Sequence, residues 1–97
     1  MARLGDEEIA RRLAALPGWR RAGDSITRTF EFASFRDAVF FVNAVAALAE
    51  GAHHHPDIDI RWRRVTLTLS THSAGGLTSL DFDLAEAIER HTQRWRG

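Results

Sequence analysis

The sequence predicts an α+β fold in which three helices pack on one face of a four-stranded antiparallel sheet. Two observations support this class. Three segments place apolar residues at helical spacing, and between them two pairs of short segments alternate apolar with polar residues, as half-buried strands do. The expected order of elements is therefore α-β-β-α-β-β-α. A chain of 97 residues is long enough for one core, so we expect a single domain over residues 1–97.

The first helix and the first two strands are expected in the N-terminal part of the chain. The helix should begin near Asp6, as its N-cap, and end at Pro17-Gly18. Strands are expected at residues 19–22 and 25–32, joined by a tight turn at Gly23-Asp24. The residues expected to be buried here are Ile9, Leu13 and Leu16 on the helix and Ile26, Phe30 and Phe32 on the second strand.

The second helix is unusually apolar. Ser34 is a suitable N-cap, the helix should end near Glu50, and Gly51 follows where a left-handed C-cap is wanted. One apolar stripe consists of Phe35, Val39, Val42 and Ala46. A second set widens it, namely Phe40, Phe41, Ala44, Val45 and Leu48. Because so much of its circumference is apolar, we expect this helix to be buried on more than one side.

Two further strands and a helix complete the expected fold. A tight connection at Arg63-Arg64 should join the strands, a loop is expected at Gly75-Gly76, and Thr78 or Ser79 should cap the last helix. On the strands, the apolar residues that alternate with polar ones are Ile58, Ile60 and Trp62, then Val65, Leu67 and Leu69. The residues of the last helix expected to point inward are Leu84, Ile88 and Trp95.

Composition excludes several classes of function. The 13 basic residues, all arginine, balance 13 acidic ones, so no net charge favours nucleic acid as a direct ligand. The absence of cysteine excludes disulfides and thiolate chemistry. No apolar run approaches the ~20 residues of a membrane span, and the N-terminus lacks an apolar signal core. We therefore expect a cytoplasmic protein that does not contact a membrane.

The residues that could carry chemistry are mainly histidines. Four of the five lie within 20 positions: His53, His54, His55 and His72. Imidazole titrates near neutral pH and is the usual acid/base group in catalysis. Each candidate also has an ordinary explanation, since a loop histidine is usually solvated, Glu50 could be a helix-end charge, and Asp81 could complete a capping box begun by Thr78. A metal site is a further alternative, although adjacent histidines rarely reach one ion together.

The spacing of these residues resembles the signature of the pterin-4a-carbinolamine dehydratase family. That signature is an acidic residue, three residues, His-His-Pro, five residues, an aromatic, nine residues, a histidine and a later aspartate. Here it reads Glu50, His54-His55-Pro56, Trp62, His72 and Asp81. The flanking segments agree as well, at Leu16-Pro17-Gly18-Trp19, Leu67-Thr68-Leu69-Ser70-Thr71-His72 and Gly75-Gly76-Leu77-Thr78. Three positions depart from the pattern, since members often carry Glu-Trp at Asp57-Ile58 and an acidic or amide residue at His53.

The resemblance implies an enzyme with a defined reaction. It implies a lyase that dehydrates 4a-hydroxytetrahydropterin to the quinonoid dihydropterin, with the pterin as substrate and with neither metal nor cofactor. It further implies a homodimer or homotetramer, and a link to an aromatic amino-acid hydroxylase whose pterin it recycles.

The chemistry suggests a division of roles. The 4a-hydroxyl leaves readily only when protonated, while a ring-nitrogen proton departs. We hypothesise that His54 and His72 flank this hydroxyl, one as general acid, and that His55 contacts the pterin and assists proton transfer. Glu50 and Asp81 would orient the imidazoles. By analogy with the family, the substrate lies along two segments, consisting of His53, His54 and His55 and of Ser70, Thr71, His72 and Ser73.

Two rival functions remain open. One is a non-catalytic binding or assembly scaffold, because family members include a dimerisation cofactor of a homeodomain transcription factor and assembly chaperones for a carbon-fixing enzyme. The chaperone-like relatives tend to lose the histidine set, which this chain keeps, so the enzyme is favoured. The other is a small metal-binding protein, which elemental analysis and chelator sensitivity would reveal.

Overall fold

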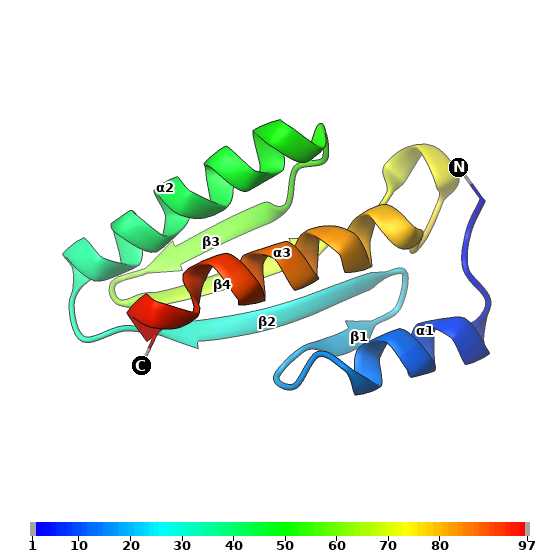
Figure 1. The fold of residues 1–97 in the computed structure, drawn as a ribbon, viewed down its shortest axis with the longest axis horizontal. Helices are drawn as coiled ribbons and strands as arrows, with labels where there is room; N and C mark the ends of the chain where they lie inside the picture. The colour runs from blue at the N-terminus through cyan, green and yellow to red at the C-terminus, as the bar shows by residue number, and fades with distance from the viewer. Residues whose placement is uncertain (1, 97) are drawn as a thin grey trace.

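The computed structural model describes residues 2–96 and has the expected architecture (Figure 1). Three helices pack on one face of a four-stranded antiparallel sheet with strand order β1-β2-β4-β3. The elements are α1 (Asp6–Ala14), β1 (Arg20–Ala22), β2 (Ser25–Glu31), α2 (Phe35–Ala52), β3 (Asp57–Arg61), β4 (Arg64–Leu69), the short 3₁₀ helix η1 (His72–Ala74) and α3 (Ser79–Arg96). The predicted fold class and element order are confirmed.

The register of the sheet separates an apolar face from a threonine face. On β2 and β4, Ile26 lies opposite Leu69 and Phe30 opposite Val65, and all four side chains are buried towards the helices. Residues of opposite parity face the other way. That uncovered face carries hydroxyl pairs across the same strands, Thr27 with Thr68 at 3.2 Å and Thr29 with Thr66 at 2.8 Å. One face therefore holds the core and the other is polar, as the alternation predicts.

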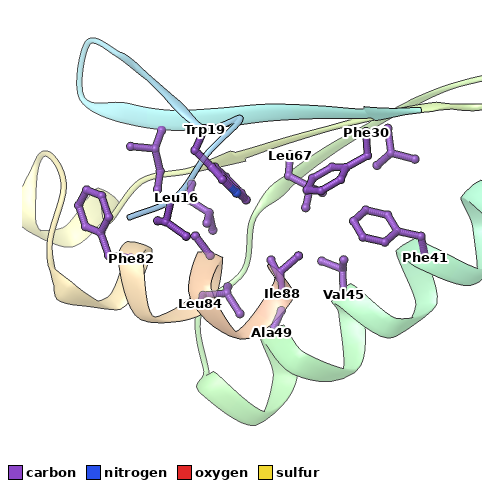
Figure 2. Packing of buried hydrophobic residues seen from close by; sticks show 14 of the residues in the cluster. Leu16, Trp19, Phe30, Phe41, Val45, Ala49, Leu67, Phe82, Leu84 and Ile88 are labelled. Atoms are coloured by element: carbon purple, nitrogen blue, oxygen red, sulfur yellow. The ribbon is translucent and has the colours of Figure 1, made fainter. Parts of the chain in front are cut away.

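The core lies between the sheet and the helices α2 and α3 (Figure 2). Phe41 of α2 is fully buried, and its ring lies 4.6 Å from that of Phe30 and 4.9 Å from that of Phe32, measured between centroids. Leu84 and Ile88 of α3 are also buried, as predicted. This aromatic and aliphatic layer fixes the two long helices over the sheet, and with them the ends that position the candidate site.

One carboxylate, Glu89 of α3, joins distant parts of the chain. It accepts hydrogen bonds from Trp19 Nε1 at 2.8 Å, Arg28 Nη1 at 2.8 Å and Arg96 Nη2 at 2.9 Å. Gly18 allows this arrangement, because it has a φ of 91° and a Cβ there would lie 2.7 Å from the guanidinium carbon of Arg28. Trp19 is therefore a core residue held at its indole nitrogen.

The helix ends differ from the expectation in two places. The N-cap of α1 is Gly5 and not Asp6, which is the first helical residue. The left-handed C-cap of α2 is His53, with a φ of 52°, and not Gly51, because the helix continues past Glu50 to Ala52. The predicted cap of α2 is confirmed, since Ser34 Oγ accepts the backbone N–H of Asp37 at 3.1 Å. These two errors move a cap by one or two residues without altering the fold.

The expectation that α2 is buried on more than one side is wrong for the single chain. Its buried residues form one stripe, consisting of Ala38, Phe41, Val45 and Ala49, and Val42 and Leu48 beside it are only partly buried against the core. Phe35 and Phe40 are 54% and 59% exposed, and Trp95, which was expected to point inward, is 54% exposed. The reason is geometric: one sheet and α3 cover only one side of the α2 cylinder, so the apolar residues beyond that side stay at the surface.

The connection between β3 and β4 also differs by one residue. The two-residue turn is Trp62-Arg63 and not Arg63-Arg64, because Arg61 and Arg64 form the last pair of the ladder. Trp62 has a φ of 58°, as the first residue of such a turn requires, and its side chain is largely exposed. Within residues 2–96, no helix is long and apolar enough to cross a membrane.

Candidate active site

The sequence-predicted site residues come from three chain segments. The first follows α2, where the left-handed His53 turns the chain and Pro56 keeps the residue before it extended into β3. The second runs from the end of β4 into η1, and the third is the first turn of α3. Figure 1 shows the C-terminal end of α2 and the N-terminal end of α3 at the same end of the molecule. Residues far apart in sequence are thereby brought to one region.

The most buried part of the site is an imidazole–carboxylate pair. His54 Nε2 lies 2.6 Å from Asp81 Oδ1, and the side chains are 10% and 0% exposed. The other oxygen, Asp81 Oδ2, accepts hydrogen bonds from Thr71 Oγ1 at 2.9 Å and from the backbone N–H of Thr78 at 3.0 Å. Because a carboxylate oxygen only accepts, His54 Nε2 is the donor, which leaves Nδ1 as the ring nitrogen for another partner. Asp81 thus fixes both the orientation and the tautomer of this ring.

Two buried hydroxyls hold the carboxylate in place. The hydroxyls of Thr71 and Thr78 are 2.8 Å apart, and Thr78 Oγ1 accepts the backbone N–H of Leu80 at 3.2 Å. Since Thr71 gives its single proton to Asp81, the proton between the two hydroxyls comes from Thr78. Hydrogen bonds therefore run one way, from Leu80 through Thr78 and Thr71 to Asp81. We call this set the hydroxyl relay.

The second imidazole–carboxylate pair is exposed. His55 Nε2 lies 2.5 Å from Glu50 Oε2, with 63% and 77% of the side chains accessible to solvent. As predicted for neighbouring extended residues, His54 and His55 are directed to different partners. An exposed pair of this kind adds little to stability. The imidazole of His55 is, however, open to a ligand. The ring of His54 is mostly buried, so a ligand can reach it only at the edge that does not face Asp81.

The remaining candidates lie around these two pairs. His72 is exposed at the start of η1, directly after Thr71 of the hydroxyl relay. His53 and Ser73 are exposed as well, and Ser70 Oγ donates to the backbone carbonyl of Asp24 at 3.0 Å. Thr71 was expected to contact the substrate, but its hydroxyl is buried and directed at Asp81. Across residues 2–96, no three histidine or carboxylate side chains converge as metal ligands.

Sequence reasoning gave Asp81 two explanations, and both describe the structure. Asp81 accepts the N–H of Thr78, which is the capping-box bond, and it also contacts His54. The residue that sequence reasoning missed is Thr78 as a support of the site, although its spacing of three from Asp81 was the available signal. The arrangement provides one imidazole of fixed orientation, an accessible one on the next residue, His55, and another on His72, which directly follows Thr71 of the hydroxyl relay. Such a set is suited to proton transfer to and from a small polar ligand.

Thr71→Val is expected to destabilise the protein by about 1–3 kcal/mol, because it leaves Thr78 Oγ1 without its acceptor and Asp81 with one donor fewer in a buried place. Urea denaturation followed by circular dichroism measures the change. Thr66→Val is the matched control, since its hydroxyl pairs with Thr29 on the uncovered sheet face, and it should change stability by less than about 0.5 kcal/mol. Equal effects of the two substitutions would contradict a special role of the hydroxyl relay.

Comparison with known proteins identifies relatives over most of the chain. Residues 2–91 match the family model described as pterin 4 alpha carbinolamine dehydratase. A protein of Roseiflexus sp. (strain RS-1), provisionally named pterin-4-alpha-carbinolamine dehydratase, is 61% identical over 87 residues, which is 90% of this chain and 94% of that protein. A protein of Nocardia farcinica with the same provisional name is 60% identical and covers 89% of this chain and 90% of its own length.

Two solved structures are similar as well. A transcriptional coactivator/pterin dehydratase from Brucella melitensis superposes with a TM-score of 0.87 at 36% identity, over 98% of this chain and 99% of that one. A pterin dehydratase-like protein described as a RuBisCO assembly factor in the alpha-carboxysome has a TM-score of 0.64 at 26% identity, over 75% of this chain and 87% of its own. The fold and the spacing of the site thus point to the same relatives.

Proposed function

The chain belongs to the pterin 4 alpha carbinolamine dehydratase family, and from this membership we propose that it dehydrates 4a-hydroxytetrahydropterin to the quinonoid dihydropterin plus water. The observation that carries the proposal is the His54–Asp81 contact of 2.6 Å. An imidazole held by a buried carboxylate beside accessible imidazoles is suited to acid/base catalysis.

The reaction requires two proton transfers. The bond from C4a to the hydroxyl oxygen breaks, and the oxygen leaves as water once it has taken a proton. A ring nitrogen of the pterin loses a proton, and the electron pair forms the new double bond. His54 and His72 would flank the hydroxyl, one of them as general acid, and His55 would contact the ring and assist the second transfer. The buried hydrogen bond to Asp81 would orient the imidazole of His54, and the exposed one to Glu50 would orient the imidazole of His55.

The substrate would lie along residues 53–55 and 70–73. The side chains of His53 and Ser73 are exposed there, whereas Thr71 would act from beneath through Asp81. In this function the pterin is the substrate, and the step uses neither metal nor cofactor. The protein would act in the cytoplasm as a homodimer or homotetramer, on pterin released by an aromatic amino-acid hydroxylase, without contacting nucleic acid or a membrane.

His54→Ala and His72→Ala are expected to lower the dehydration rate about 10²- to 10⁴-fold, the range for loss of a general acid or base. The assay follows loss of the 4a-hydroxytetrahydropterin by absorbance. His91→Ala is the control, since His91 is exposed on α3 and has no assigned role. Rates close to wild type in both variants would overturn the proposed mechanism.

A non-catalytic assembly or binding role is the second candidate. The similarity to the protein described as a RuBisCO assembly factor favours it, although that similarity covers only 75% of this chain at 26% identity. Binding of a reduced pterin to purified protein separates the two roles. Folded protein that binds no reduced pterin would favour the scaffold.

A further inference from the structure

The loop between β4 and α3 carries His72 and is closed by its own backbone hydrogen bonds. The N–H of Thr71 donates to the carbonyl of Gly76 at 3.0 Å, and the N–H of Gly76 donates back to the carbonyl of Thr71 at 3.4 Å. Within the loop, the N–H of Gly75 donates to the carbonyl of His72 at 3.1 Å. We call residues 70–77 the His72 loop. These internal bonds fix the shape of the loop, but they do not fix where it lies relative to the rest of the molecule.

Two segments distant in sequence hold the His72 loop from outside. On one side, Ser70 Oγ donates to the carbonyl of Asp24, in the turn between β1 and β2, at 3.0 Å. On the other side, the backbone N–H of Leu4 donates to the carbonyl of Leu77 at 2.8 Å. Figure 1 shows the segment before α1 passing beside this loop. We call residues 3–5 the N-terminal arm.

The side chain of Arg3 also crosses the loop. Arg3 Nη1 lies 3.5 Å from the carbonyl oxygen of Gly75. Gly76 leaves room for this crossing, because a Cβ at Gly76 would lie only 3.0 Å from Cδ of Arg3. The N-terminal arm therefore contacts three successive residues of the His72 loop, 75–77.

The N-terminal arm is itself anchored to α1 and to the core. Gly5 is the N-cap of α1, and its carbonyl accepts the N–H of Ile9 at 3.0 Å. Ile9 and Leu77 are buried, and the side chain of Leu4 packs against the same core. Because the arm is tied to a packed helix, it holds the loop at a fixed place on the molecule.

The N-terminal arm and the hydroxyl relay act on different parts of the loop. The relay fixes Thr71, at the base of the loop, through Asp81 to His54. The arm acts on residues 75–77, beyond His72. His72 therefore lies between two separate attachments. Such precision matters in catalysis, because a displacement of about 1 Å can cost about 100-fold in rate.

We propose that the N-terminal arm positions His72 for the dehydration, with the backbone N–H of Leu4 as the decisive contact. The inference deepens the proposed function and rests on it for the role of His72. Leu4 is a positioning residue, which acts on the substrate only through the loop. The arm keeps the imidazole of His72 within reach of the hydroxyl that His54 also faces.

Leu4→Pro tests this contact, because proline has no backbone N–H to donate to Leu77. It should lower kcat per folded molecule about tenfold to a hundredfold and leave KM within about twofold, since it displaces a group that is needed in the transition state. Leu4→Ala is the matched control, because it also loses the half-buried side chain but keeps the N–H. Its kcat should stay near that of wild type. A fall in kcat that is equal in the two variants, or absent from both, overturns the role of the N–H.

The link to His72 is tested by a double variant. In a His72→Ala background, Leu4→Pro should have no further effect on kcat, because the arm acts only through that imidazole. A general loosening of the fold would instead multiply the two losses. Multiplied losses overturn the proposal.

Deletion of residues 2–4 provides a second variant that does not place proline in the chain. It leaves the N-cap Gly5 and the hydrogen bond from Ser70 to Asp24 in place. Hydrogen exchange followed by NMR should show the N–H groups of Thr71 and Gly76 exchanging about tenfold faster than in wild type, as loss of a supporting hydrogen bond implies. The N–H groups of β2 and β4 are the internal control and should keep their wild-type exchange rates. Unchanged exchange in the loop overturns the hold of the arm.

The outcomes separate this inference from the proposed function. Full activity of folded Leu4→Pro and of the deletion variant overturns the positioning role and leaves the dehydratase assignment intact. Wild type without dehydratase activity overturns the proposed function, and with it the role given to His72. Hydrogen exchange decides whether the arm holds the loop in either case.

Discussion

Replacing Asp81 with asparagine is expected to lower kcat for the proposed dehydration about 10³- to 10⁴-fold, the size of effect seen when a buried carboxylate that orients a catalytic imidazole becomes an amide. Asp81 accepts three hydrogen bonds, from His54, Thr71 and the backbone of Thr78. The amide that replaces the carboxylate has one accepting oxygen and one donating NH₂ group. The NH₂ group must therefore face either His54 Nε2–H or the donors of Thr71 and Thr78, and in each case donor faces donor. Either His54 loses its orientation and tautomer or the hydroxyl relay is broken.

The same substitution should lower the free energy of unfolding by about 1–3 kcal/mol, because the unpaired donors are buried. Single-turnover rates and urea denaturation measure the two effects separately. Asp83→Asn is the matched control on the same helix, since Asp83 is exposed and its contact with Arg12 is a surface ion pair of 3.0 Å. Such a pair contributes about 0–1 kcal/mol and should not affect the rate. A folded Asp81→Asn variant with nearly normal kcat would show that His54 needs no orientation.

Phe41→Ala is expected to have the largest effect on stability, lowering the free energy of unfolding by about 3–5 kcal/mol. Phe41 is fully buried, and its ring contacts those of Phe30 and Phe32 where α2 crosses the sheet. Truncation leaves a cavity between α2 and the sheet. Because the backbones of both layers are held in place, neighbouring side chains can fill this cavity only in part. Chemical denaturation monitored by circular dichroism gives the value directly.

The neighbouring residue provides the control for this prediction. Phe40→Ala removes the same atoms from the next position of α2, but Phe40 is 59% exposed. Its effect on the free energy of unfolding should stay within about 0.5 kcal/mol. If the two alanine variants were equally destabilised, the side of α2 that faces the sheet would have been assigned wrongly.

The fold was predictable because short-range patterns determine most of it. The alternation of Val65, Leu67 and Leu69 and the cap at Ser34 depend only on neighbours in sequence, and both agree with the structure. The errors at Phe35 and Trp95 have a different origin. Periodicity shows that a helix has apolar faces, but it does not show whether this chain or another molecule covers each one.

The site was predictable in part. The Thr78 to Asp81 spacing indicated a capping box, and the structure contains that bond. The contact of Asp81 with His54 joins residues 27 positions apart, and such a pairing depends on how α3 lies across the end of α2. The match of their spacing to a family signature predicted that these residues form one site. Helix-capping and solvation preferences alone explained each of them as a separate surface residue. The inward direction of Thr71 likewise follows from tertiary packing and has no local signal.

Because of the hydroxyl relay, the orientation of the His54 ring depends on the local stability of the first turn of α3. Its first donor is the N–H of Leu80, one of the first residues of α3, and its last acceptor is the carboxylate that holds the ring. Local unfolding of the first turn of α3 would break all the hydrogen bonds of the relay together, and with them the contact of Asp81 with His54. In the proposed dehydration, the population of molecules with His54 held for proton transfer would therefore be set by the free energy of that local opening. Substitutions that strengthen the N-terminal turn of α3 would act on this population without contacting the proposed substrate.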